Sequence, residues 1–97
     1  MIVYVLAQLS MKDRAAYNRY LARFMGVFEQ FRGTLLVADE HPSVLEGQWH
    51  DDKVVLMSFP DEQAFREWAD SAAYQEILKD RKEGADAVVL LLHGVTR

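Results

Sequence analysis

Four aromatic residues and one acidic residue could together form a binding site for a small organic molecule. They are Tyr4, Glu46, Trp49, Trp68 and Tyr74. Aromatic rings can stack against a flat ligand, and the Tyr4 hydroxyl, in an otherwise apolar segment, could bind a ligand carbonyl or phenol. Glu46 would then serve as an acid, a base or a polar anchor. The alternative is structural, with Glu46 solvated and the aromatic residues filling the core.

The three histidines, His41, His50 and His93, are a second candidate site. We expect the turns before the third strand and the end of the last strand to lie at the same end of the sheet, where the three could meet. With Asp51 or Asp52 they could bind a divalent metal or transfer protons. The alternative is three independent surface histidines. No H-x-E or H-x₃-H spacing places two ligands on one element, so we expect no metal and no other cofactor.

The motifs of several enzyme classes are missing from the sequence. It has no P-loop, dinucleotide-binding fingerprint, Gly-x-Ser-x-Gly or HExxH motif, and it has no cysteine. Nothing therefore supports a hydrolase, a kinase, a nicotinamide-dependent enzyme or thiolate chemistry.

Strand-like segments must position these residues. They are apolar and rich in β-branched residues, and they cover residues 2–9, 34–38, 54–59 and 88–92. Residues 44–49 are expected to be extended as well, with a bulge or a close approach at Gly47.

Helical spacing separates the strands. After the first strand, apolar residues recur every three or four positions, at Tyr17, Tyr20, Leu21, Phe24, Phe28 and Phe31. Ser10 and Asp13 resemble a capping box at the start of this helix, and Gly33 is expected to end it. A second helical region follows the third strand, with a new cap at Ser71 and an end at Gly84.

The order β-α-β-β-α-β predicts an α+β, ferredoxin-like fold. Its four-stranded antiparallel sheet carries the helices on one face, and we expect the strand order 4-1-3-2. The 97 residues suit a single domain, residues 1–97.

Composition narrows the choice of partner and compartment. The chain has 15 acidic against 11 basic residues, a net charge of −4, which argues against nucleic-acid binding because that depends on neutralising phosphates. Its apolar opening segment is shorter than the ~20 residues of a membrane helix, so we expect no membrane association. The lack of cysteine fits a reducing, cytoplasmic location.

The strands are apolar on both faces. Residues 2–7, 54–57 and 88–92 are apolar at every position, whereas an antiparallel sheet with one face in water should alternate. The helices can cover only one face, and the other would be a larger apolar patch than soluble monomers usually expose. We therefore expect a homodimer that packs sheet against sheet around a two-fold axis.

Several segments resemble the DUF1330 family, a group of small proteins in the dimeric α+β barrel superfamily. The resemblance covers nearly the whole chain, and its motifs are Tyr4-Val5-Leu6-Ala7, Asp13-x-x-Ala16-Tyr17-x-x-Tyr20, Phe31-x-Gly33, Val44-Leu45-Glu46-Gly47-x-Trp49, Phe59-Pro60, Phe65-x-x-Trp68 and Ser71-x-x-Tyr74-Gln75. The family usually has Pro-Glu where this chain has Ala72-Ala73. The resemblance implies a dimeric α+β barrel and no assigned function.

These observations predict a protein that binds a small organic molecule between helices and sheet. Tyr4, Trp49, Trp68 and Tyr74 would line the pocket. If the protein is an enzyme, we expect cofactor-independent oxidation or isomerisation, since other families on this fold are monooxygenases and isomerases. The alternative is a dimeric interaction or regulatory module without catalysis. A cavity of at least ~300 Å³ would favour the first function, and a filled interface the second.

Overall fold

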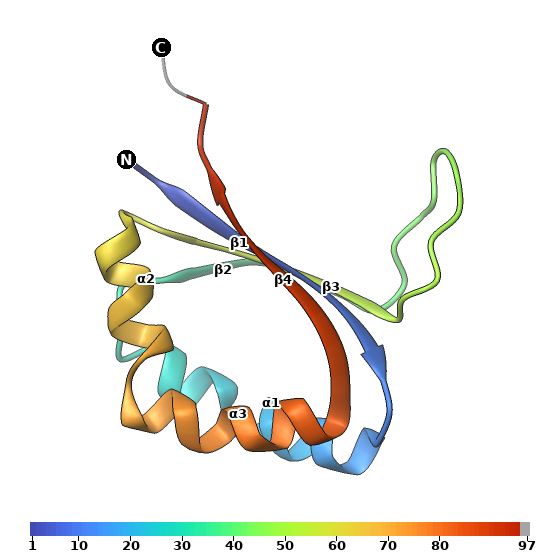
Figure 1. Ribbon diagram of the computed structural model, residues 1–97, viewed down its shortest axis with the longest axis horizontal. Coiled ribbons are helices and arrows are strands. Elements are labelled where there is room, and N and C mark those ends of the chain that lie inside the picture. The colour runs from blue at the N-terminus through green and yellow to red at the C-terminus, as the bar shows by residue number, and fades with distance from the viewer. Residues whose placement is uncertain (96–97) are drawn as a thin grey trace.

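The computed structural model describes residues 1–95 and shows a four-stranded antiparallel sheet with its helices on one side (Figure 1). The elements are β1 (Val3–Met11), α1 (Arg14–Phe28), β2 (Thr34–Asp39), β3 (Lys53–Phe59), α2 (Glu62–Ala69), α3 (Ala72–Gly84) and β4 (Ala85–His93). None of the helices within residues 1–95 is long and apolar enough to cross a membrane.

The strand order is β2-β3-β1-β4, which is the predicted order read from the opposite edge. β1 pairs with β3 from Val3↔Phe59 to Leu9↔Lys53, and with β4 from Val3↔His93 to Met11↔Ala85. Because both neighbours run antiparallel to β1, β3 and β4 run in the same direction. This confirms the ferredoxin-like α+β fold.

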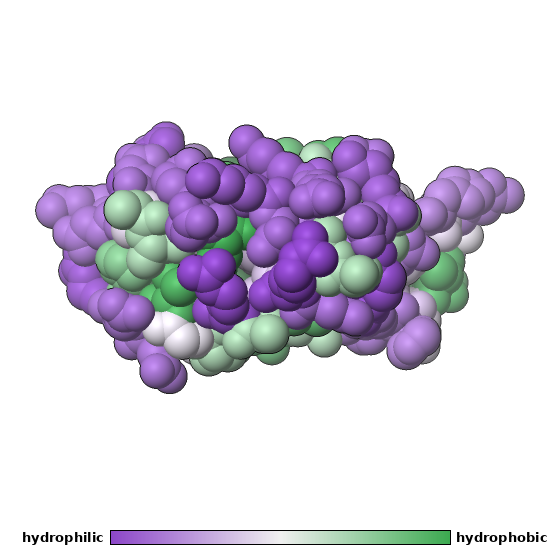
Figure 2. Space-filling model, turned by 90° about the horizontal axis from the view of Figure 1, so that it is seen from below, coloured by the Kyte–Doolittle hydropathy of each residue, from purple (hydrophilic) through white to green (hydrophobic). Residues whose placement is uncertain are grey.

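Alternation along β1 separates the two faces of the sheet. Val3, Val5 and Leu9 are buried against the helices, whereas Tyr4 and Leu6 between them are only partly buried on the other face. We call these the helix face and the open face of the sheet. The outer surface of the helix layer is mostly hydrophilic, with hydrophobic patches between the polar side chains (Figure 2).

The caps of α1 and α3 differ in how well they were predicted. Ser71 caps α3 as expected, since its Oγ accepts a hydrogen bond from the Tyr74 N–H at 3.1 Å. The prediction that Ser10 takes part in capping α1 is wrong, because β1 extends through Ser10 and the Ser10 hydroxyl donates to Asp51 Oδ1 at 2.7 Å. Asp13 is the N-cap of α1.

Two glycines are required by close packing. α1 ends at Phe28 and Gly33 has no positive φ, so the expected left-handed stop at Gly33 is wrong. A Cβ on Gly33 would instead lie 2.5 Å from Phe28 Cζ. Gly84 does end α3, and a Cβ there would lie 2.4 Å from the Tyr17 amide nitrogen. The backbones of α1 and α3 therefore meet directly at Gly84.

Residues 40–52 form a loop that projects from the end of the sheet (Figure 1). Residues 44–49, which were predicted to be extended, belong to none of the strands of the described chain. Gly47 adopts a φ of 86° and Leu45 is 96% exposed. The base of the loop is held to β1, where the Asp52 N–H donates to the Leu9 carbonyl at 2.7 Å.

Candidate functional site

A cavity of about 270 Å³ lies between the helix face of the sheet and the helices. Most of its lining is aliphatic or aromatic and includes Val5, Leu21, Phe24, Leu35, Met57 and Phe65. Protein interiors usually contain few voids larger than a water molecule. The volume falls short of the ~300 Å³ that was expected of a ligand pocket, which is the lower end of the typical range of about 300–1,000 Å³. A ligand of this cavity would therefore have to be small.

Aromatic rings gather around Trp68, which lines the cavity. Its ring centroid lies 4.1 Å from that of Tyr74 and 5.4 Å from that of Phe28. The indole is buried, and its Nε1 has no acceptor within residues 1–95. An unpaired buried donor costs about 1–3 kcal/mol. An N–H···π contact with a neighbouring ring would recover only a small part of that cost.

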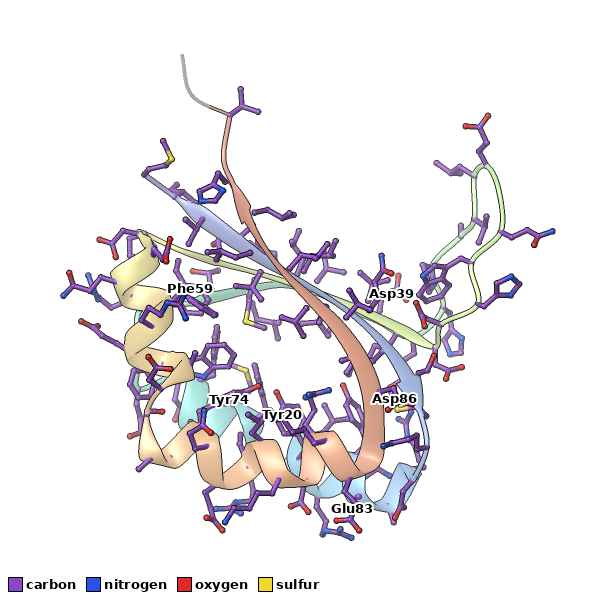
Figure 3. The ribbon with its side chains drawn as sticks, viewed as in Figure 1. Tyr20, Asp39, Phe59, Tyr74, Glu83 and Asp86 are labelled. Atoms are coloured by element: carbon purple, nitrogen blue, oxygen red, sulfur yellow. The ribbon has the colours of Figure 1, made fainter. Side chains whose placement is uncertain are left out.

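A pair of phenol groups joins α1 to α3. The hydroxyl oxygens of Tyr20 and Tyr74 lie 3.2 Å apart, and the two side chains point toward each other (Figure 3). Burial, the largest cause in both cases, raises the pKa of Tyr20 strongly and also raises the pKa of Tyr74. Both phenols are therefore protonated at neutral pH. One hydroxyl hydrogen is used within the pair, and the second is available to another acceptor.

Lys53 is the first residue of β3, and it is the one buried residue with a charged side chain among residues 1–95. It is 4% exposed and lines the cavity. Its Nζ lies 4.9 Å from the centroid of the Tyr17 ring, a cation–π contact. Burial lowers the pKa of the Lys53 ammonium, and the nearby Glu40 carboxylate opposes that shift. Glu40 itself is engaged by Arg14, whose two guanidinium nitrogens lie 2.8 and 2.9 Å from its oxygens.

All charged residues that line the cavity are basic. Arg81 and Lys82, in the last turn of α3, join Lys53 in the lining, and no Asp or Glu among residues 1–95 does. The chain as a whole carries a net charge of −4. The cavity is therefore a local exception to the acidity of the protein.

These groups could bind and polarise an oxygen atom or move a proton. A protonated phenol can donate to a carbonyl or oxyanion, and an amine whose pKa is lowered is a better base near neutral pH than an exposed lysine. Among residues 1–95, no group of three or more His, Asp or Glu side chains could hold a metal ion.

The structure brings together only part of the predicted pocket. Trp68 and Tyr74 line the cavity, but Tyr4, Glu46 and Trp49 do not. Tyr4 lies on the open face of the sheet, because its neighbours in β1 point toward the helices. Glu46 is exposed and Trp49 is half-buried, and both lie in the projecting loop. The predicted placement of these three residues in a helix–sheet pocket is therefore corrected.

The expected meeting of the three histidines is wrong. His93 lies opposite Val3, whereas His41 and His50 lie in the loop that leads to Lys53, which is opposite Leu9. Six residues of β1 separate these positions, about 20 Å of strand. The reason is direction: β3 and β4 run the same way, so the end of β4 lies beside the end of β3.

The sequence analysis did not predict a role for Lys53 or for the hydroxyl pair that Tyr20 forms with Tyr74. A signal for Lys53 was present, because Lys53, Val55, Met57 and Phe59 alternate along β3 and share one face. A lysine in register with three apolar residues indicates a charge facing the core. Tyr20 was recognised in the apolar stripe of α1, but only the tertiary structure places its hydroxyl beside Tyr74.

A family model described as a domain of unknown function, DUF1330, matches residues 2–95. No curated protein matches the chain with significance.

Solved structures from several organisms share this fold. RPA0582, a protein of unknown function from Rhodopseudomonas palustris, superposes with a TM-score of 0.81 at 22% identity, over 99% of this chain and 84% of its own. A dimeric ferredoxin-like protein of unknown function from Jannaschia sp. CCS1 has a TM-score of 0.81 at 16% identity, over 97% of this chain and 100% of its own. SnoaB, a cofactor-independent oxygenase from Streptomyces nogalater, has a TM-score of 0.67 at 16% identity, over 99% of this chain and 95% of its own. At these identities the likeness establishes the fold and no activity.

Proposed function

Because this chain belongs to the DUF1330 family, whose function is unknown, we propose a function from its own cavity: the protein binds a small, largely apolar organic molecule between its helices and its sheet. The observation that carries the proposal is an unfilled volume of about 270 Å³ in an aliphatic and aromatic lining. Filling such a space with apolar atoms removes their surface from water, at about 25 cal/mol per Å².

The aromatic side of the cavity suits a flat ligand. Trp68 and Tyr74 would contact its ring, and the hydroxyl hydrogen left over from the pair formed by Tyr20 and Tyr74 would bind a ligand oxygen. This arrangement combines apolar walls with a few polar groups, as ligand pockets commonly do.

Cofactor-independent oxidation or isomerisation of the bound molecule is the catalytic extension of this proposal. SnoaB, a cofactor-independent oxygenase, shares the fold, and this support is an analogy of fold alone. Isomerisation would need a base and an acid in one cavity. Lys53 and the hydroxyl pair formed by Tyr20 and Tyr74 are the groups that this chain offers.

We also propose that two copies associate through the open faces of their sheets. Apolar side chains on this face include Leu6, Leu56, Val88, Leu90 and Leu92, with Val88 58% and Leu90 45% exposed. The relative from Jannaschia is described as dimeric. In the alternative function, this dimer is a non-catalytic interaction module and the cavity binds nothing.

The two tryptophans allow a direct test of binding by NMR. In a ¹H–¹⁵N spectrum, the indole signals of Trp68, in the cavity, and Trp49, in the loop, serve as probe and internal control, assigned with Trp49→Phe. We expect naphthalene and 2-naphthol to shift the Trp68 signal and leave the Trp49 signal in place.

A filled cavity should abolish this shift. Ala69 lines the cavity, so Ala69→Leu places extra methyl groups in it, whereas Ala22→Leu makes the same change on the exposed side of α1. Binding should be lost in the first variant and kept in the second. A Trp68 signal that no apolar probe shifts, or that shifts equally in Ala69→Leu, would favour the interaction module.

The dimer is tested by light scattering. We expect a mass near twice the 11.2 kDa of the chain. A mass that stays at that of one chain across a wide range of protein concentrations would refute the association.

A further inference from the structure

The charges around the cavity define its ligand more closely. We propose that the ligand is an organic oxyanion, an aromatic ring that carries a carboxylate or a similar group, and that Lys53 binds its charged oxygen. This inference rests on the proposed function of the cavity.

The isolation of Lys53 is the first observation behind this proposal. The side chain is 4% exposed, and within residues 1–95 its ammonium forms no ion pair and no hydrogen bond with the protein; Nζ itself keeps some contact with solvent, since Trp68 Nε1 is the fully buried unpaired atom of these residues. An ammonium has three donors, and a charge that is largely removed from water without a protein partner is unfavourable. The cation–π contact with Tyr17 offsets only part of this cost. An anion in the cavity would supply the missing partner.

The nearest charged groups do not fill that role. The Glu40 carboxylate raises the Lys53 pKa from a distance, but both of its oxygens are held by Arg14. Arg14 itself lowers the Lys53 pKa because the two charges are alike. Lys53 therefore has a carboxylate in its vicinity and none in contact.

The second observation is the sign of the charges that line the cavity. Arg81 and Lys82 line it with Lys53, and no acidic residue of the part that the structure describes does so, although the chain has a net charge of −4. Arg81 and Lys82 have a structural explanation, because cations at the last turn of a helix interact favourably with its dipole. Lys53, at the start of a strand, has no such explanation. We therefore assign the ligand contact to Lys53, with the other two adding positive potential.

The third observation is the row of aromatic rings that begins beside Lys53. Centroids lie 5.8 Å apart for Tyr17 and Tyr20, 6.4 Å for Tyr20 and Tyr74, and 4.1 Å for Tyr74 and Trp68. An aromatic acid could place its carboxylate at Lys53 and its ring along this wall. A purely aliphatic anion would use the charge and not the rings.

A matched pair of ligands tests the proposal. 2-Naphthoate and 2-naphthamide have nearly the same size and shape, and only the first is charged. By titration calorimetry at neutral pH, we expect the wild-type protein to bind the naphthoate about ten- to a hundredfold more tightly, the factor that corresponds to one hydrogen bond to a charged group. The preference should survive 0.5 M NaCl, because buried pairs are screened much less than exposed ones.

Variants assign the preference to Lys53. Lys53→Met keeps a side chain of similar length without the charge, and it should bind both compounds with nearly equal affinity. Lys53→Arg should retain a preference for the naphthoate. Lys12→Met removes an exposed lysine that is paired with Asp86 outside the cavity, and it should behave as the wild type.

The possible failures are distinct. If the wild type binds neither compound nor any neutral apolar probe, the proposed function itself is wrong. If it binds both compounds equally, the cavity takes apolar ligands and the oxyanion proposal is wrong. If Lys53→Met keeps the full preference, the assignment to Lys53 is overturned. The wild-type ratio is decisive even if a variant fails to fold.

Discussion

The two faces of the sheet have similar apolar strands and very different surroundings. On the helix face, Val5 is 2% exposed, while on the open face Val88 is 58% exposed. Among residues 1–95, the covered face carries one buried charge, Lys53, and the open face carries a patch of aliphatic side chains. Each face therefore has residues that its surroundings do not explain: a charge among apolar side chains on the helix face, and exposed aliphatic side chains on the open face. We propose a ligand as the partner of the charge on the covered face and a second copy as the cover of the apolar open face.

The largest effect is expected from placing a charge on the helix face. Val5→Asp buries a carboxylate among apolar side chains, at a cost of several kcal/mol. Small domains are stable by only about 5–15 kcal/mol, so we expect most of the protein to be unfolded. Circular dichroism and the dispersion of amide NMR signals measure this outcome. A folded Val5→Asp protein would mean that this face is not the closed core.

The same substitution on the open face should have a different consequence. Leu90→Asp is expected to leave the fold intact and to raise the dissociation constant of the dimer at least about a hundredfold, a change of ~3 kcal/mol. Light scattering would then report one chain, with an unchanged circular dichroism spectrum. Ala22→Asp, on the outer side of α1, is the matched control and should remain dimeric. A dimeric Leu90→Asp protein would contradict the sheet-to-sheet arrangement.

Alanine substitutions at two glycines compare the packed contact between α1 and α3 with the outer surface of α1. Gly84→Ala places a Cβ 2.4 Å from the Tyr17 amide nitrogen, and the overpacking should destabilise the protein by about 1–3 kcal/mol. Gly26→Ala adds a Cβ with nothing within 4 Å inside α1, and it should stabilise by about 0.5–1 kcal/mol. Urea unfolding measures both changes. Equal effects at the two positions would show that α1 and α3 are not in direct backbone contact.

A smaller effect is expected at high pH from the buried Tyr17 of α1. Burial, with a smaller effect of Glu40, raises the pKa of Tyr17 to about 12 from an ordinary value near 10. The unfolded chain therefore loses this proton first, so the stability that the protonated phenol contributes is present below pH ~10 and is lost between about pH 10 and 12. Urea midpoints at pH 8, 10 and 11 should fall more steeply for the wild type than for Tyr17→Phe.

The titration of Lys53 also changes the stability of the fold in this pH range, but in the opposite direction. Because burial lowers its pKa in the folded protein, stability rises with pH up to the ordinary value of 10.5. Tyr17→Phe keeps Lys53, so a comparison of the two proteins largely isolates the phenol. Parallel pH profiles for wild type and Tyr17→Phe would show that Tyr17 titrates normally in the fold.

Local patterns were sufficient for much of this structure. Strand composition and helical spacing predicted the element order and the strand order, and the family resemblance agreed with them. Ser71 and Gly84 were recognised as helix boundaries from local spacing and residue type, whereas the close contact of Gly84 with the Tyr17 backbone is seen only in the tertiary structure. Trp68 and Tyr74 were treated as a pair from their closeness in the sequence, and the structure places them on consecutive helices, α2 and α3, with ring centroids 4.1 Å apart.

Other features depend on contacts between segments far apart in the sequence. A two-residue period separates the faces of β1 but does not say which one the helices cover when both are apolar, and for this reason Tyr4 was placed in the pocket. The relative direction of β3 and β4 separates His93 from His41, and no local pattern records it. The sequence by itself determined the order of the strands and helical regions, and it predicts that both faces of the sheet need cover. Only the tertiary structure decided that Lys53 and the hydroxyl pair of Tyr20 and Tyr74 share a cavity, because register and packing depend on the whole chain at once.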